Sequence, residues 1–440
     1  MTPRALAFKI LKNALSGETY SNIAVDNALK KNQMSDADSG LLTAIVMGVT
    51  ERRLTLNHII NKLSSRPDKV DDDTRILLQM GIYQVLYLDR IPEYAAVNET
   101  VELAPRRSRG FVNAIMRELL RRRQKGMLEE LFPDRETSPV ENLSVKHSFP
   151  EDVCERFISL YGYERAERIF EIFNRPPKLT LRINTLKISR SDYARLLDEK
   201  GINYELSNRL ENAILLENIS FASLPGFDEG YFFVQDEASQ ICVEALDAKA
   251  GMLMIDSCSC PGSKSFGSAI KMRNEGKILA FDLHSSKLKL IDKSAMRLGV
   301  EIIEAAERDG RDFEPSLEGV ADRVLSDVPC SGLGVIAKKP EIRYKNVADF
   351  ARLPEIQYAI LENCSRYVKE GGVLVYSTCT LLPEENENNV LKFLDSHKDF
   401  EAVDFVVGDI GSVGGMLTLT PDEYMTDGFF VAKMKRREVN

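Results

Sequence analysis

Hydrophobic residues recur at helical spacing along the first part of the chain. Within several runs the apolar positions lie three or four residues apart, as on one face of an α-helix, and glycine and proline are scarce. These runs are residues 1–15, 41–63, 74–88, 93–104 and 109–122. Amphipathic helices of this kind bury their apolar faces against one another. The pattern therefore predicts an all-α helical bundle over residues 1–130.

The pattern changes after this predicted bundle. Residues 127–150 mix proline with polar residues, as connectors do, and we expect His147 to be an ordinary loop residue there and not a metal ligand. Helical spacing returns over residues 151–174 and gives way to the strand-like runs "KLTLRINTLK", "NAILLE" and "GYFFVQD". We expect residues 145–235 to form a small mixed α/β linker module.

Short apolar runs alternate with helical segments from residue 236 to residue 440. The runs include "MLMIDS", "KILAFDL", "EIIEAAE", "DRVLSDV" and "GGVLVYST". Strands separated by helices of roughly 10 to 15 residues are typical of a parallel, doubly wound sheet. The sequence therefore predicts a multi-domain protein of α and α/β class with a C-terminal doubly wound, Rossmann-like domain.

Polar residues and cysteines stand where these predicted strands end. They are Asp256, Asp282, Asp309, Asp327, Cys330 and Cys379. Doubly wound sheets bind ligands beyond the carboxyl ends of their strands, where an acidic residue commonly accepts hydrogen bonds from a ribose diol. The loop "DSCSCPGSKS" can also turn backbone N–H groups toward a ligand. We expect a nucleoside-containing cofactor, and these residues leave open a methyl donor or a dinucleotide.

Composition excludes several classes of protein. A hydrophobic content of 44% is normal for a globular chain, and no apolar stretch reaches the roughly 18 to 20 residues of a membrane span. Because residues 1–15 lack a cleavable signal pattern, we expect a soluble, cytoplasmic protein, taken as a monomer. Seven cysteines without a C-x-x-C pattern disfavour a disulfide framework. Cys258 and Cys260 have no histidine nearby, so no metal site is expected.

Positive charge is concentrated in one segment, although the net charge is -9. Residues 104–126 contain eight Lys or Arg residues and one Glu. Clustered guanidinium groups can bind nucleic-acid phosphates even on an acidic protein, whereas the plainer interpretation is a solvated helix face. We expect RNA contact in this segment. The candidate residues are Arg106, Arg107, Arg109, Arg121, Arg122 and Arg123.

Longer motifs carry a resemblance to a known family. "DRVLSDVPCSGLGVIAKKPEIRY" and "GGVLVYSTCTLLPEENENNV" closely resemble the two cysteine motifs of the RNA cytosine-C5 methyltransferases. "DSCSCPGSK" is similar to their cofactor loop, with departures at Ser259, Cys260 and Ser263, and "VQDEASQ" and "DGFFVAKMKR" also look like family segments. These motifs span residues 175–435, and the N-terminal helices resemble the NusB-type RNA-binding domain. This combination is similar to the subfamily that acts on 16S ribosomal RNA.

The resemblance implies a cofactor and its site. The cofactor would be S-adenosyl-L-methionine, which leads us to expect methylation of carbon 5 of a cytosine in 16S ribosomal RNA. The expected cofactor-binding residues are Cys258, Ser259, Cys260, Pro261, Gly262, Ser263, Lys264, Asp282, Asp309 and Asp327. RNA contacts are also expected in the small α/β module, at Arg182 and Asn184.

The same resemblance assigns roles to the two cysteines. Cys379 would be the nucleophile that adds to carbon 6 of the base, and Cys330 would assist elimination. Asp327 would stabilise the charge that develops on the base during addition. Lys264 would lie near that carboxylate and favour a thiolate.

Other functions remain open at this point. A tRNA cytosine is the alternative substrate. A non-catalytic RNA-binding assembly protein is a second alternative. The absence of either cysteine or of Asp282 would have favoured it, but all three residues are present. A redox enzyme using Cys330 and Cys379 as a dithiol is a third, but it would leave Asp282 and Asp309 without a use.

Overall fold

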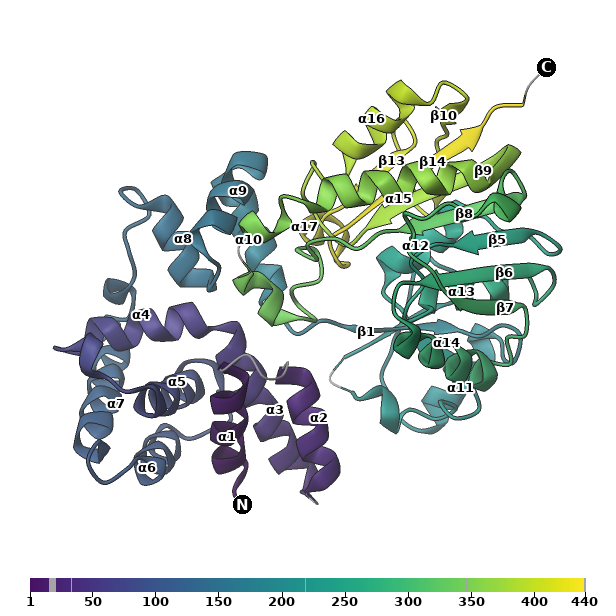
Figure 1. Ribbon diagram of the computed structural model, residues 1–440. Coiled ribbons are helices and arrows are strands. Elements are labelled where there is room, and N and C mark those ends of the chain that lie inside the picture. The colour runs from purple at the N-terminus through teal and green to yellow at the C-terminus, as the bar shows by residue number, and fades with distance from the viewer. Residues whose placement is uncertain (16–20, 33, 218, 346, 439–440) are drawn as a thin grey trace. The chain divides into compact units, whose positions relative to one another are not determined.

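The computed structural model consists of two compact units, each described here by itself (Figure 1). Unit 1 comprises Met1–Asn174 with Lys339–Val347, and unit 2 comprises Arg175–Lys338 with Ala348–Asn440. The structure describes residues 1–15, 21–32, 34–217, 219–345 and 347–438. Within these ranges no helix is both long enough and apolar enough to cross a membrane.

Unit 1 is helical. Its helices are α1 (Pro3–Leu15), α2 (Ser21–Lys31), α3 (Asp36–Glu51), α4 (Arg53–Leu63), α5 (Asp72–Tyr87), α6 (Glu93–Leu103), α7 (Arg109–Gln124), α8 (Pro139–His147), α9 (Glu151–Tyr161) and α10 (Tyr163–Phe173), with 3₁₀ turns η1 (Pro67–Lys69), η2 (Glu129–Leu131) and η5 (Pro340–Tyr344).

The predicted N-terminal bundle is confirmed, and its helices begin and pack as the sequence indicates. Ser35 and Asp71 cap α3 and α5 by accepting hydrogen bonds from backbone N–H groups of the first turn. Gly48 lets α3 approach α5 closely, because an added Cβ would lie 1.9 Å from the Tyr83 ring. Leu42 and Ile45 on the same helix are fully buried.

The predicted connector is partly helical, which corrects the expectation for His147. Pro139 occupies the first turn of α8, where its missing N–H costs nothing. Leu143 and Val145 are buried, and His147 is the buried last residue of the helix. Tertiary burial of this short apolar face outweighs the polar, proline-containing composition that indicated a loop. Helices α8 to α10 belong to unit 1, whereas the strands that follow belong to unit 2.

A short segment distant in sequence completes unit 1. The turn η5 presents Arg343, which is fully buried and donates to the Asn174 side-chain oxygen at 2.7 Å and to the backbone oxygen of Glu51 at 3.2 Å. The hydroxyl of Tyr344 donates to the same Glu51 oxygen at 2.8 Å. These bonds attach residues 339–347 to helices of unit 1.

Unit 2 contains two sheets, a short hairpin and seven helices within its described residues. Its strands are β1 (Leu179–Ile183), β2 (Glu205–Leu206), β3 (Ala213–Leu216), β4 (Phe232–Val234), β5 (Leu253–Asp256), β6 (Lys277–Asp282), β7 (Ile303–Glu307), β8 (Ala321–Asp327), β9 (Val368–Thr378), β10 (Phe400–Ala402), β11 (Val406–Val407), β12 (Ile410–Gly411), β13 (Met416–Leu419) and β14 (Phe429–Arg436). Its helices are α11 (Arg190–Glu199), α12 (Glu237–Leu246), α13 (Ser263–Lys271), α14 (Ser285–Leu298), α15 (Leu353–Tyr367), α16 (Glu387–Ser396) and α17 (Pro421–Tyr424), with 3₁₀ turns η3 (Phe221–Ser223), η4 (Pro315–Leu317) and η6 (Val347–Phe350).

The small sheet is antiparallel, with order β2-β3-β1-β4. Helix α11 packs on it through Tyr193 and Leu197, which share a buried cluster with Leu181 and Ile183 of β1. This is the mixed α/β part that the strand-like runs predicted.

The large sheet has the order β10-β14-β9-β8-β5-β6-β7, and β13 pairs with β14. The five strands from β9 to β7 are parallel, whereas β14, β10 and β13 are antiparallel neighbours. The predicted Rossmann-like domain is confirmed, with a mixed sheet in place of a wholly parallel one. The chain order reverses between β5 and β8, and such a switch point is where these sheets bind ligands.

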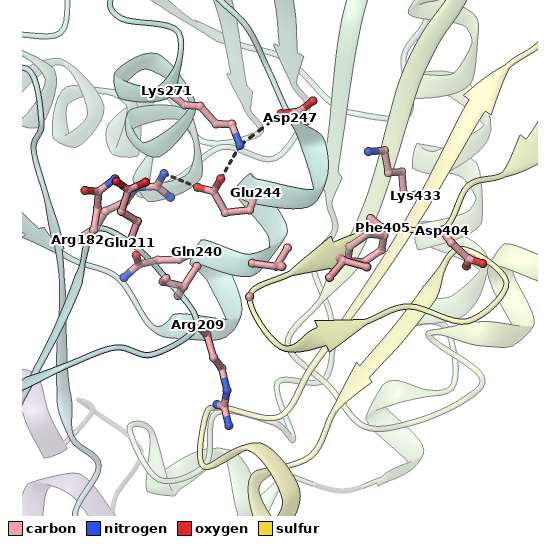
Figure 2. Close-up of a pocket in the computed structure, with 15 residues that line it drawn as sticks. Arg182, Arg209, Glu211, Gln240, Glu244, Asp247, Lys271, Asp404, Phe405 and Lys433 are labelled. Atoms are coloured by element: carbon pink, nitrogen blue, oxygen red, sulfur yellow. Dashed lines mark hydrogen bonds and ion pairs between the residues drawn. The ribbon is translucent and has the colours of Figure 1, made fainter.

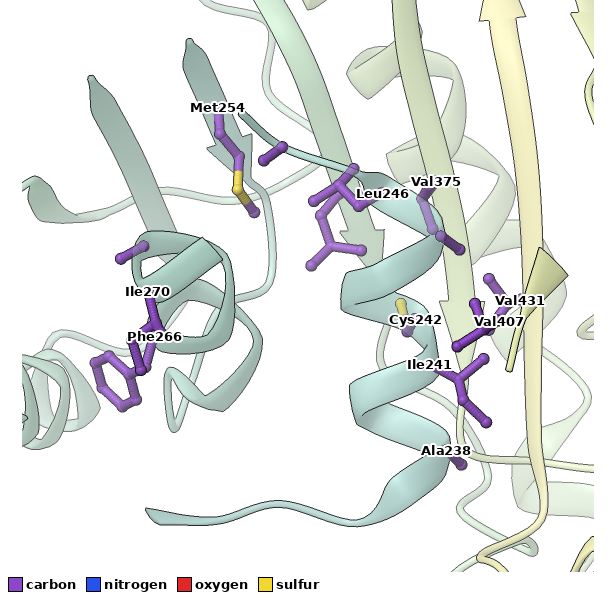
Figure 3. Close-up of a cluster of buried hydrophobic side chains, with 14 of the residues drawn as sticks. Ala238, Ile241, Cys242, Leu246, Met254, Phe266, Ile270, Val375, Val407 and Val431 are labelled. Carbon is purple, nitrogen blue, oxygen red and sulfur yellow. The ribbon is translucent and has the colours of Figure 1, made fainter. Parts of the chain in front are cut away.

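Helices cover both faces of this sheet because alternate strand residues are apolar on both sides. Val375 of β9 belongs to one buried cluster with α12, α13 and α14, and Tyr376 belongs to the other with α15 and α16. Figure 3 shows Ile241 and Cys242 of α12 directed toward β9 and β14. Two rigid layers therefore fix the strand ends that carry the site.

Candidate active site

The two cysteines of interest meet at the ends of adjacent parallel strands. Asp327 of β8 pairs in register with Ser377 of β9, so the loops that follow the two strands begin side by side. The Sγ atoms of Cys330 and Cys379 lie 3.1 Å apart, and the backbone N–H of Cys379 donates to the Cys330 sulfur at 3.3 Å. Both cysteines are partly exposed and free of disulfides.

Asp327 lies between a lysine and a serine. Lys264 Nζ donates to Asp327 Oδ2 at 2.6 Å, and Ser377 Oγ donates to Oδ1 at 2.7 Å. Burial acts to lower the pKa of Lys264, but the Asp327 carboxylate together with Cys242 and Cys379 outweighs burial, so the pKa is raised. Lys264 is therefore charged at neutral pH, and its charge also interacts with Cys379.

Cys330 holds its proton more firmly than a free thiol does. Hydrogen bonding to Cys379 and then burial raise the pKa of Cys330 well above that of a free thiol. Cys330 therefore keeps its proton at neutral pH. Cys330 can donate this proton to the Cys379 sulfur, and Lys264 supplies a positive charge near Cys379.

A buried carboxylate that the sequence analysis missed holds the two cysteine loops together. Glu385 Oε2 accepts from the backbone N–H of Ser331 at 2.9 Å and from Gln357 Nε2 at 2.7 Å. The hydroxyl groups of Ser331 and Thr380 lie 2.7 Å apart, which joins the residues directly following each cysteine. The only sequence signal for this contact was the acidic "PEEN" that follows the Cys379 motif.

The predicted cofactor loop joins β5 to α13. Gly262 has a φ of 101°, and an added Cβ there would lie 2.6 Å from the Phe266 ring. Ser263 is the first residue of α13 and does not have a positive φ, so a serine suits this position.

At the end of β5, buried Asp256 accepts a hydrogen bond from Ser265 Oγ at 2.5 Å, and its Oδ1 lacks a partner among the described residues. Burial raises the pKa of Asp256 to about 7.

Strand β6 ends at Asp282, and Asp309 lies two residues after the end of β7. Asp282 accepts from the backbone N–H groups of His284 at 3.0 Å and Cys260 at 3.3 Å, which aligns the β6 end with the cofactor loop. Each carboxylate oxygen has a second lone pair with which to accept from a ribose hydroxyl. Asp309 is bonded to Arg311 through both oxygens, so a ligand would share them with that guanidinium. These donors and acceptors fit a nucleoside.

The structure corrects the expectation for Asn184. Asn184 is fully buried, and its Nδ2 donates to the backbone oxygens of Gly230 and Leu298 at 2.9 and 2.8 Å. Because these bonds use both amide hydrogens, Asn184 joins the small sheet to α14 and has none left for RNA.

Arg182 is also buried, at 3% exposure, and its Nη2 donates to Glu244 at 2.9 Å. Arg182 lines a pocket with a volume of about 500 Å³. Figure 2 shows that Lys271 pairs there with the same Glu244. An arginine so paired helps to pack the module, and its burial limits contact with RNA phosphates.

The arginines of the basic segment are on or next to α7 in unit 1. Arg121 and Arg122 pair with Glu118 at 2.6 and 2.9 Å, and Arg123 pairs with Glu93 at 3.3 Å. Arg106, Arg107 and Arg109 are exposed. Arg107 lies 3.8 Å from Asp71, and Arg109 donates to the Ala104 backbone oxygen. Ion pairs thus neutralise more of the positive charge at the C-terminal end of α7 than in the residues that precede its N-terminus.

Comparison with known proteins covers nearly the whole chain. Family models match residues 1–121 (NusB family), 149–220 (RsmF/B-like methyltransferase, ferredoxin-like domain) and 243–435 (16S rRNA methyltransferase RsmB/F). The chain is 36% identical to the probable ribosomal RNA small subunit methyltransferase B of Bacillus subtilis, over 99% of this chain and 98% of that protein. The protein of the same name from Synechocystis sp. is also 36% identical, over 99% and 100%. The crystal structure of PH0851 superposes with a TM-score of 0.79 at 28% identity, covering 99% of both chains.

Proposed function

This chain belongs to the family of 16S rRNA methyltransferases RsmB/F, and we propose that it methylates carbon 5 of a cytosine in 16S ribosomal RNA. The observation that carries this proposal is the pair of thiols, Cys330 and Cys379, 3.1 Å apart beside Asp327 and Lys264. Carbon 5 of cytosine is a weak nucleophile. Addition of a thiolate to carbon 6 turns the ring into an enamine whose carbon 5 can accept a methyl group.

The methyl donor in this proposal is S-adenosyl-L-methionine, which supplies a methyl group made electrophilic by its sulfonium. Residues 258–264 and Asp282 would hold it, with Asp282 accepting from the ribose hydroxyls and Asp309 lying near the adenine amino group. The support is the position of both carboxylates after successive strands: Asp282 ends β6, which adjoins β5 at the switch point, and Asp309 lies two residues beyond β7.

Cys379 forms the bond to carbon 6. Its thiolate is stabilised by the thiol proton of Cys330 and by the positive charge of Lys264. As the bond forms, an electron pair moves toward N3 of the base and into the enamine. N3 takes a proton relayed from the charged Lys264 through Asp327, which accepts from Lys264 and Ser377, so that the enamine is neutral.

Cys330 acts after methyl transfer. Once Cys379 is bonded to carbon 6, the largest of the interactions that hold the proton on Cys330 is removed, so Cys330 can pass that proton to solvent water and then accept the one on carbon 5. The electron pair of the carbon–hydrogen bond then forms the 5,6 double bond and expels the Cys379 thiolate. One cysteine makes the adduct and the other resolves it.

The test is transfer of a labelled methyl group from S-adenosyl-L-methionine to purified RNA. We expect the full-length protein to label 16S ribosomal RNA, bisulfite sequencing to locate one methylated cytosine, and Cys379→Ala to abolish both signals. Label in tRNA alone would identify the alternative tRNA methyltransferase. Absence of label from both RNAs, with RNA still bound, would favour a non-catalytic assembly protein.

A further inference from the structure

A buried histidine nitrogen in unit 1 lacks a hydrogen-bond partner. His147 ends α8 and is 5% exposed, and its Nε2 is unpaired among the described residues. The nearest acceptor is Glu167 Oε1, at 3.6 Å. That distance is too long for a hydrogen bond, and a buried polar atom without a partner is unfavourable. We therefore expect Nε2 of His147 to bind a partner other than the described protein groups.

Two carboxylates lie next to this nitrogen. Glu167 and Glu171 are four residues apart on α10, so they project from the same face of the helix. One ligand atom from each of the three residues lies within 4.8 Å of the others. Two atoms that each bind a tetrahedral Zn²⁺ at about 2.0 to 2.1 Å are about 3.4 Å apart. The 3.6 Å between His147 and Glu167 is therefore close to the separation of two zinc ligands.

The charges of the cluster suit a divalent cation. The ring nitrogen Nε2 of His147 is buried without a hydrogen-bond partner among the described residues, which leaves it able to ligate a cation. The two carboxylates together match the charge of one divalent ion. Lys146 Nζ occupies Glu167 Oε1 at 2.8 Å and competes with a cation for that oxygen. Glu171 is exposed, and no hydrogen bond or ion pair of its side chain occurs in the described ranges.

We propose that His147, Glu167 and Glu171 bind a divalent transition-metal ion of the zinc class that links α8 to α10. One imidazole and two carboxylates leave a fourth position for water, as three protein ligands commonly do. The backbone oxygen of His147 also accepts from Asn174 Nδ2 at 2.9 Å and from Arg343 at 3.4 Å. The metal would thus stabilise the helix end to which residues 339–347 are attached.

The test uses the full-length protein after dialysis against a chelator. Addition of Zn²⁺ is expected to raise the Tm by a few degrees, because a ligand that binds only the folded state stabilises it. Isothermal titration is expected to give one Zn²⁺ per chain. Co²⁺, which adopts the same tetrahedral geometry and absorbs visible light, is expected to bind without a sulfur-to-metal charge-transfer band.

Three variants assign the site. Glu171→Gln removes an exposed ligand without disturbing the core and should weaken Zn²⁺ binding by about tenfold or more, in line with the effects of altered metal-site residues. His147→Gln should abolish the rise in Tm. Glu155→Gln is the matched control, because it removes an exposed carboxylate of neighbouring α9 that lies outside the cluster and should bind Zn²⁺ like the unmodified protein.

Two results would overturn the proposal. One is no Zn²⁺ bound to the chelator-treated protein, or binding that Glu171→Gln leaves unchanged. The other is Co²⁺ bound with a strong sulfur charge-transfer band that Cys379→Ser removes, because the metal would then lie at the cysteine pair of unit 2.

Discussion

Cys330 and Cys379 are 49 residues apart in the chain, yet their Sγ atoms lie 3.1 Å from each other. The contact exists because β8 and β9 are adjacent parallel strands whose carboxyl ends meet at one edge. It couples the two thiols, and the coupling leaves the proton on Cys330. Substituting the two cysteines should therefore have different consequences.

Cys330→Ala is expected to accumulate a covalent protein–RNA complex. Cys379 can still add to carbon 6 and methyl transfer can proceed, but the proton on carbon 5 is not removed, so the thiol cannot leave. A denaturing gel should show a shifted band that requires S-adenosyl-L-methionine.

Cys379→Ala and the double variant are the controls for this band, and neither should form it. A band from Cys379→Ala but not from Cys330→Ala would reverse the roles. Full activity in both single variants would exclude covalent catalysis by either sulfur. The band is the better assay, because residues acting as a unit have non-additive effects on rate.

Asp282→Ala should weaken the binding of S-adenosyl-L-methionine by about 1.5 to 3 kcal/mol, the usual contribution of hydrogen bonds to a charged group. The variant loses the acceptors for the ribose and also the bond from the Cys260 backbone that aligns the cofactor loop. Calorimetry measures the affinity directly. Asp292→Ala, an exposed change on the following helix α14, should bind normally. Equal affinities for the two variants would place Asp282 outside the cofactor site.

The positions of the candidate site residues were predictable because they depend on topology that the sequence pattern contains. Alternating apolar runs and helices imply parallel strands, and the polar residues after each run then gather at one edge. Asp282, Asp327, Cys330 and Cys379 followed from that rule and from the motifs. The short distance between Cys330 and Cys379 could not be predicted in this way, because it depends on the order in which the strands pair.

Residues whose role depends on tertiary burial were not predictable in this way. The family resemblance led us to expect RNA contact at Asn184 and Arg182, but the packing of the small module buries both. His147 was assigned to a loop because residues 127–150 mix proline with polar residues, and the packing that makes α8 a helix is tertiary. Its proximity to Glu167 requires α8 and α10 to pack together, which no local pattern records.

The N-terminal side of the basic segment is the better place to test RNA binding. Replacing Arg121 and Arg122 would also break their ion pairs with Glu118 and confuse the result. Arg106→Ala combined with Arg107→Ala should weaken RNA binding. The slope of log K against log salt should fall by about 0.7 to 0.9 for each phosphate that the variant no longer neutralises.

Lys30→Ala with Lys31→Ala is the matched control, because it removes two exposed positive charges from α2 of the same unit. Filter binding at several salt concentrations gives both slopes. Equal slopes for the two double variants would mean that Arg106 and Arg107 belong to a solvated face.

Asp256 should make folding depend on pH in a direction opposite to that of most carboxylates. Burial raises its folded pKa to about 7, whereas an unfolded aspartate titrates near about 3.9. Between these values the folded protein keeps a proton that the unfolded chain has released. Stability therefore falls as pH rises from about 4 to about 7, by up to about 4 kcal/mol at about 1.4 kcal/mol per unit.

Asp256→Asn removes this titration while keeping an oxygen that can accept from Ser265 Oγ. The charged neighbours Asp327 and Lys264 are unchanged, so the difference in free energy of unfolding between variant and unmodified protein isolates Asp256. In urea unfolding without cofactor, the free energy of unfolding of Asp256→Asn relative to the unmodified protein should increase from about pH 4 to about pH 7. Above about pH 7 this difference should stay constant. Asp292→Asn should show no such trend, because Asp292 is exposed. A difference for Asp256→Asn that does not vary with pH would mean that its carboxyl is ionised in the folded protein, and that the orphaned Oδ1 has a partner such as bound water.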